Sequence, residues 1–130
     1  MNRQRVSSHS PWESVVGYSR AIRAGGHVFV AGTTAVDASG KLVCIGDAYG
    51  QTRRILQIIE QALHAAGATM EEVVRTRIYV VNIARDAEAV GRAHGDVFRD
   101  IRPASSLVEV SQLMEPEMLV EIEVHAVATA

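Results

Sequence analysis

Three polar side chains that could move protons alternate along one stretch near the C-terminus. Glu121, Glu123 and His125 are separated by apolar residues. A period of two predicts a strand with one dry face and one face that carries these groups. A carboxylate held there can direct a water molecule and transfer a proton, as hydrolysis requires. The pattern also fits solvated carboxylates paired with Arg75 or Arg77 across the sheet, so both interpretations stay open.

The same three side chains also raise the possibility of a metal site, because carboxylates and imidazoles ligate zinc and iron. A usable site needs a further ligand. The remaining histidines are His9, His27, His64 and His94. None stands in a recognised metal-binding spacing, and the two on predicted helices would lie across the sheet from Glu121. We therefore predict no metal and no cofactor.

Two side chains could act as nucleophiles, but neither has the surroundings that this role needs. Ser105 lacks a Gly-x-Ser-x-Gly context, and the sequence places no base beside it. Cys44 has no evident cationic neighbour to activate its thiol. We predict that neither is a nucleophile.

The composition is that of an ordinary globular chain. It has 130 residues, of which 48% are hydrophobic and 22% charged, and a formal net charge of −2. This length suffices for a single domain spanning residues 1–130, and the charge gives no case for binding nucleic acid or an anionic membrane. No apolar run approaches the roughly 20 residues of a membrane span. One cysteine and no secretory pattern favour the cytoplasm.

Hydrophobic periodicity predicts two helices among several strands. Residues 1 to about 13 lack periodicity and are expected to form a loose tail. The expected strands are 18–24, 27–32, 73–82, 107–110 and 120–126, and the expected helices are 47–66 and 86–98. Gly25-Gly26 favours a tight hairpin between the first two strands. The result is an α+β fold, β-β-α-β-α-β-β, in which two helices cover one face of a mixed sheet.

Capping residues and side-chain alternation refine this picture. Asp47 and Asp86 are the expected N-caps of the two helices, and Gly67 stands where a left-handed C-cap belongs. In strand 73–82, Arg75 and Arg77 point to the face opposite the helices. A sheet face without helices suits packing against other subunits, with ligand sites between them.

Several short motifs together resemble the RidA/YjgF family, formerly called the L-PSP endoribonuclease family. The resemblance spans nearly the whole chain. The matching motifs are Gly17-Tyr18, Gly32, Ala65-Ala66-Gly67, Val74 to Val80, Arg102-Pro103-Ala104, Leu107 to Val110, Val120 to Glu123 and Ala126-Val127. The resemblance implies a chorismate-mutase-like fold, a homotrimer with clefts between subunits, and hydrolysis of small enamines or imines such as 2-aminoacrylate.

The resemblance also implies which residues line the cleft. Glu121 corresponds to the glutamate that positions the attacking water. Tyr18 and the backbone of Gly32 correspond to cleft-lining positions. Ser105 stands where the family has an arginine that clamps the substrate carboxylate, and Leu107 stands where the family often has cysteine.

The serine at position 105 changes the expected ligand. A charged hydrogen bond contributes on the order of 1.5–3 kcal/mol, so its loss weakens a carboxylate ligand roughly 10- to 150-fold. Either another cation such as Arg102 or Arg77 substitutes, or the ligand is not a free α-carboxylate. We expect hydrolysis of a C–N compound other than 2-aminoacrylate, or alternatively a non-catalytic metabolite-binding protein. The sequence has no basic track that would support ribonuclease activity.

Overall fold

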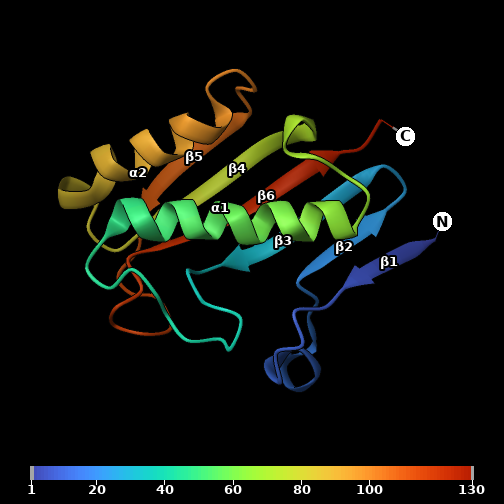
Figure 1. The fold of residues 1–130 in the computed structure, drawn as a ribbon, viewed down its shortest axis with the longest axis horizontal. Coiled ribbons are helices and arrows are strands. Elements are labelled where there is room, and N and C mark those ends of the chain that lie inside the picture. Colours follow the sequence, from blue (N-terminus) through green and yellow to red (C-terminus); the bar gives the residue numbers. More distant parts are fainter. Residues whose placement is uncertain (1, 130) are drawn as a thin grey trace.

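A computed structural model describes residues 2–129 and contains one six-stranded sheet with the order β1-β2-β3-β6-β4-β5. The strands are β1 (Arg3–Val6), β2 (Ala21–Ala24), β3 (His27–Thr33), β4 (Val73–Val80), β5 (Ala104–Glu109) and β6 (Val120–Val127). The helices are α1 (Ala48–Ala65) and α2 (Ile83–Phe98), with a π-helical turn at Glu13–Gly17 and a 3₁₀ turn at Met70–Glu72. Both helices lie on the same face of the sheet (Figure 1). Strands β4 and β5 pair in parallel, and the other pairs are antiparallel.

The predicted α+β arrangement is confirmed, with one strand added at the N-terminus. Residues 3–6, which were expected to belong to a loose tail, pair with β2, from Arg3 opposite Ala24 to Val6 opposite Ala21. This strand lies at the edge of the sheet, where polar side chains are common. Its first three residues are polar and exposed, so the hydrophobic pattern could not reveal it.

Helix α1 matches its prediction in position and in caps. The Asp47 carboxylate accepts a hydrogen bond from the Gly50 amide at 2.9 Å, and Gly67 adopts a φ of +80° just after the helix. Ile55, Ile59 and Leu63 are completely buried along the inner face. Burying each of them contributes roughly 1.5–3 kcal/mol, which fixes the helix on the sheet.

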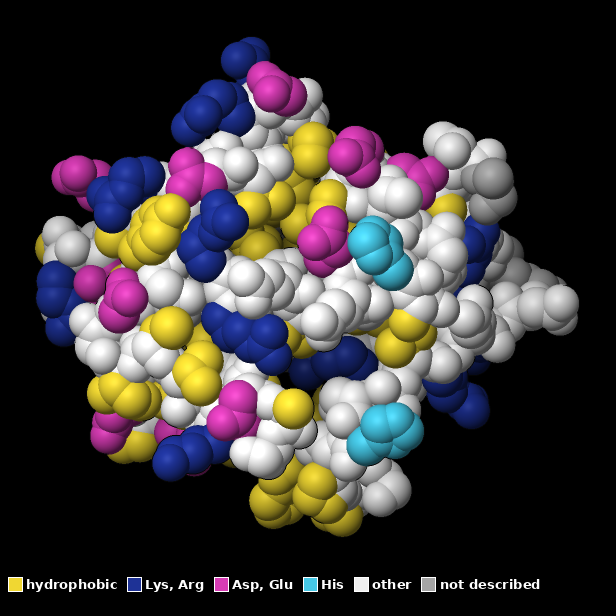
Figure 2. Space-filling model, in the orientation of Figure 1, with side chains coloured by type: hydrophobic (Ala, Val, Ile, Leu, Met, Phe, Trp, Pro, Cys, Tyr) yellow, Lys and Arg dark blue, Asp and Glu magenta, His cyan; other side chains and the backbone are white. Residues whose placement is uncertain are grey.

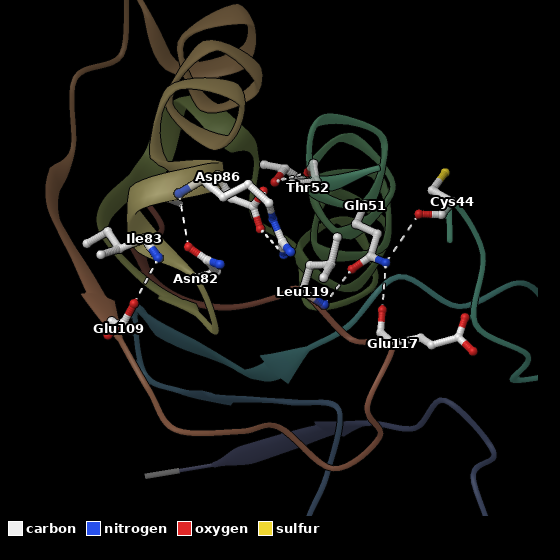
Figure 3. Close-up of polar contacts among 11 residues, drawn as sticks. Cys44, Gln51, Thr52, Asn82, Ile83, Asp86, Glu109, Glu117 and Leu119 are labelled. Atoms are coloured by element: carbon white, nitrogen blue, oxygen red, sulfur yellow. Dashed lines mark hydrogen bonds and ion pairs between the residues drawn. The ribbon is translucent and has the colours of Figure 1, made fainter. Parts of the chain in front are cut away.

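Helix α2 begins earlier than predicted. Asn82 is its N-cap and accepts a hydrogen bond from the Arg85 amide at 3.0 Å. Asp86 is instead buried inside the first turn, where it pairs with Arg85 at 2.8 Å. The strand before the helix ends at Val80, two residues sooner than expected, which releases Asn82 for capping. Glu109 also accepts from the Ile83 amide at 3.0 Å, so β5 contributes to this helix end (Figure 3).

A buried glutamine ties the segment before β6 to the start of α1. The Gln51 amide group donates to the carbonyls of Cys44 and Glu117 at 3.2 and 3.0 Å, and its oxygen accepts from the Leu119 amide at 3.0 Å (Figure 3). Gln51 is completely buried. Leu119 lies two positions before Glu121, so this contact fixes the point at which β6 begins.

The two faces of the sheet differ in chemistry as the alternation predicts. Ile78, Val120 and Ile122 face the helices and are buried. Arg77 and Glu123 lie on the opposite face and pair with each other at 3.5 Å. On the side that the helices cover, basic and acidic side chains are intermixed (Figure 2). Within residues 2–129, no helix is long and apolar enough to cross a membrane.

Candidate active site

The carboxylate of Glu121 lies directly against the backbone of Gly32. A Cβ atom placed on Gly32 would stand 2.6 Å from Glu121 Oε2, so any side chain here would displace the carboxylate. The β3–β6 pairing shifts register between Val30 and Thr33, which is where Gly32 lies. The structure therefore brings together two of the residues that the resemblance singled out, one from β3 and one from β6.

Arg20 is a third member of this group, and the sequence did not suggest it. Its guanidinium donates to the Gly32 carbonyl at 2.6 Å, and its positive charge acts on Glu121. Arg20 Nε is buried and has no hydrogen-bond partner among the described residues. Burial lowers the pKa of Arg20, and the charges of Tyr18, Glu13 and Glu121 oppose that effect.

The surroundings of Glu121 favour the protonated form of its carboxyl group. Burial is the largest cause and raises the pKa; Arg20 opposes this effect, and the negative charge of Glu123 adds to it. The pKa of Glu121 is raised above its ordinary value of 4.5 as a result. A carboxyl group with a raised pKa accepts a proton more readily than an ordinary carboxylate and can return it later in a reaction.

Glu123 is occupied by other side chains of the sheet. Tyr79 Oη donates to its carboxylate at 2.6 Å, and Arg77 lies 3.5 Å away. This hydrogen bond raises the pKa of Tyr79, because a phenol that donates to a carboxylate resists deprotonation. The contacts give Glu123 a structural role in holding β4 against β6.

His125 belongs to a ring cluster rather than to the glutamates. Its Nε2 lies 2.9 Å from Nδ1 of His27, and its ring stacks on Phe29 with centroids 4.4 Å apart. Burial, together with the neighbouring His27, lowers the pKa of His125. Among residues 2–129, no group of three or more His, Cys, Asp or Glu side chains could hold a metal ion.

Tyr18 lines a hollow of about 530 Å³ on the same side of the sheet as Glu121. Charged residues of the hollow are Arg5, Arg75, Arg77 and Glu123, and His125 is part of its wall. Glu121 and Gly32 are not among the lining residues. Tyr18 thus lies on the Glu121 side of the sheet, and the hollow that it lines is open on that side.

Ser105 and Leu107 lie on the opposite side of the sheet. The parallel pairing of β4 and β5 sets Ser105 beside Thr76 and Leu107 beside Ile78, and both partners face the helices. Within one chain, these two positions cannot reach Glu121, because the sheet itself lies between them. A site that uses both groups requires two copies of the chain.

The side chains of the two arginines proposed as substitutes for the missing cation are not directed at Ser105. Arg102 has a φ of +56° and donates from Nε to the carbonyl of Arg99 at 3.0 Å, which turns its side chain back toward the end of α2. Arg77 lies on the Glu121 side and pairs with Glu123. The cation that acts on Glu121 is Arg20. Arg20 is held there by its hydrogen bond to the Gly32 carbonyl, a contact between residues 12 positions apart that no sequence motif indicates.

The fold and this acid–base group define an α+β protein with a half-buried carboxylate held over a glycine. A model of the endoribonuclease L-PSP family matches residues 8–128. The chain belongs to this family, also known as RidA/YjgF.

Relatives support the assignment along the whole chain. An uncharacterized protein of Streptomyces coelicolor is 41% identical over 95% of this chain and 90% of its own length. The 3-aminoacrylate deaminase RutC of Acinetobacter baylyi is 33% identical over 81% of this chain and 82% of its own. A crystal structure of a YjgF/YER057c/UK114 family member from Mycobacterium tuberculosis superposes with a TM-score of 0.88 at 50% identity, covering 98% of this chain and 100% of that one.

Proposed function

We propose that this protein hydrolyses a small enamine or imine in clefts between the subunits of a homotrimer. The observation that carries the proposal is the position of Glu121, whose carboxylate lies against Gly32 with a raised pKa. A group with this protonation behaviour is suited to a reaction in which one carboxyl must first accept a proton and then return it. The relative with a deaminase name supports the same class of chemistry.

The reaction needs only water and proton transfers. An enamine becomes an imine when a proton moves from nitrogen to carbon. Water then adds to the imine carbon, and Glu121 accepts one proton of the water and passes it to the nitrogen, which gives a carbinolamine. Glu121 next takes the hydroxyl proton of the carbinolamine and delivers it to the amine, so the C–N bond breaks, ammonia leaves, and a carbonyl remains. The N–H groups near Gly32 and Leu107 are the backbone donors that we assign to the developing charge.

A trimeric assembly would bring together the two groups of cleft residues that lie on opposite sides of the sheet in one chain. Tyr18, Gly32 and Glu121 lie on one side of the sheet, and Ser105 and Leu107 lie on the other. If the edge strand β5 of one subunit meets the Glu121 side of the next, the five residues form one cleft. We assign Glu121 to catalysis and the other four residues to substrate binding.

The substrate that we propose differs from 2-aminoacrylate at its carboxylate. Ser105 offers a neutral hydroxyl where a cation would be needed to pair with that group. The RutC relative is named for 3-aminoacrylate, an enamine with a different placement of nitrogen. Both compounds are therefore useful first substrates, and slow turnover of each is the expected result.

The test is ammonia release from freshly generated 2-aminoacrylate and 3-aminoacrylate, measured with the native chain and Glu121→Gln. We expect acceleration by the native chain and a loss of roughly 10²- to 10⁴-fold in the variant. Glu88→Gln, an exposed residue of α2, is the matched control and should keep full activity. Full activity in Glu121→Gln would remove this residue from the mechanism.

A non-catalytic role in binding a metabolite is the second candidate, and the hollow beside Tyr18 favours it. Its volume of about 530 Å³ suits a small molecule, and three arginines line it against one glutamate. Saturable binding of a small anion, abolished by Arg75→Gln and accompanied by no hydrolysis of any enamine, would favour this function over the first.

A further inference from the structure

Ser105 stands at the outer end of a chain of three hydrogen-bonded side chains. Thr76 Oγ1 donates to Ser105 Oγ at 2.7 Å, and His94 Nε2 lies 3.0 Å from the same Thr76 oxygen. The three residues come from β5, β4 and α2. The chain runs from helix α2 along the helix-facing side of the sheet to an exposed position on the edge strand.

The interior part of this chain is firmly held. Thr76 is completely buried, and the His94 ring packs against Phe98 with centroids 4.7 Å apart. Burial lowers the pKa of His94, so its imidazole is neutral at physiological pH. A neutral imidazole has one N–H donor and one acceptor nitrogen.

The direction of the chain depends on the tautomer of His94. When Thr76 gives its single hydroxyl hydrogen to Ser105, its oxygen accepts from His94. His94 then carries its proton on Nε2. The hydroxyl hydrogen of Ser105 is not needed inside the chain and is available to an acceptor outside it. Successive hydrogen bonds polarise one another, which makes this outer hydroxyl a better donor than an isolated serine.

Within its own chain, the side chains that neighbour this donor are uncharged. Its hydrogen-bonded neighbours are a threonine and a neutral histidine, and Leu107, two residues further along the same face, is apolar. Arg102 is turned toward the carbonyl of Arg99. A carboxylate brought here would lose water without gaining a cation from the same chain, whereas a carbonyl oxygen would gain a directed donor at little desolvation cost.

We infer that Ser105 selects a substrate whose acyl group is uncharged, an amide or ester in place of a free carboxylate, and that Thr76 and His94 are its positioning residues. This inference rests on the proposed function for the identity of the cleft and narrows the class of its substrate. The hydroxyl of Ser105, positioned by Thr76 and His94, would thus recognise the substrate in place of the arginine of the family.

The test uses stable carbonyl compounds, so it does not depend on turnover. Pyruvamide and pyruvate are titrated into the native chain, and the ratio of their dissociation constants is measured by NMR. We expect pyruvamide to bind more tightly to the native chain. Ser105→Ala and Thr76→Val should each raise the dissociation constant of pyruvamide roughly 2- to 10-fold, with little change in that of pyruvate. Thr76→Ser, which keeps the hydroxyl, should bind pyruvamide as the native chain does. Ser105→Arg should reverse the preference.

A spectroscopic measurement separates a positioning role from a purely structural one. The ¹⁵N shifts of the His94 ring should report protonation on Nε2 in the native chain, with a change in Thr76→Val and a native-like signal in Thr76→Ser. Tighter binding of pyruvate than pyruvamide by the native chain, or protonation of His94 on Nδ1, would overturn the inference. Selective pyruvamide binding without enamine hydrolysis would instead leave the inference standing and reject the catalytic proposal.

Discussion

Glu121 differs from Glu123, the other carboxylate of its strand, in what surrounds it. Tyr79 and Arg77 are the partners of Glu123. Glu121 instead lies against the backbone of Gly32, and Arg20 donates to the Gly32 carbonyl beside it. At the scale of single residues, this contrast assigns different roles to two glutamates that the sequence alone presents as equivalent. Burial raises the pKa of Glu121, and this shift has consequences for both stability and activity.

The sign of the stability effect follows from the raised pKa of Glu121. A carboxyl group whose pKa is higher in the folded state than the ordinary 4.5 binds protons more readily when folded. The stability that it contributes is present below pH 4.5 and is lost as the pH rises through the folded-state pKa. Denaturant midpoints of the native chain and Glu121→Gln, compared from acid to neutral pH, should diverge in favour of the variant. Parallel curves would contradict a raised pKa.

Gly32 is required because it leaves space for the Glu121 carboxylate. In Gly32→Ala, the new Cβ would stand 2.6 Å from Oε2, so the carboxylate must move. A displacement of about 1 Å at a reacting group can reduce the rate roughly 100-fold, and we expect a loss of that order in kcat/KM. Gly91→Ala is the control, because a Cβ there meets nothing within 4 Å and helix α2 should gain slightly in stability. Equal activity in both variants would refute the role of Gly32.

At the scale of elements, Gln51 holds the segment before β6 in place. Gln51→Leu would remove three part-buried hydrogen bonds, to two carbonyls and one amide, which should destabilise the fold by about 3 kcal/mol. Chemical denaturation measures this loss. The exposed Gln61 of the same helix offers a matched change to leucine, for which a surface position predicts less than about 0.5 kcal/mol. Equal destabilisation by the two changes would contradict the account.

The elements that alternation and capping define were predictable from the sequence. Helix α1 shows both signals, and β6 alternates without interruption, so both were placed closely. Strand β5 shows why the site was harder. Its burial differs little between its two sides, because an edge strand is exposed on both, and no contrast of polarity indicates which way Ser105 points. Only its register with β4 places Ser105 beside Thr76.

At the scale of the whole molecule, the separation of the two residue groups is the main constraint on function. The Glu121 group faces away from the helices, and the Ser105 group faces toward them. A solution mass corresponding to three chains is the expected result for the native protein. A monomer would contradict the shared cleft, because one chain cannot place both groups around one ligand.

The most direct measurement of the central claim is activity in mixed oligomers. Glu121→Gln and Leu107→Trp, a change that should block the β5 side of the cleft, are each expected to be inactive alone. After the two are unfolded together in equal amounts and refolded, about a quarter of the clefts should combine a native Glu121 from one chain with a native Leu107 from another. We predict recovery of enamine hydrolysis to about that fraction. No recovery in well-formed mixed oligomers of these two inactive variants would contradict a site shared between chains.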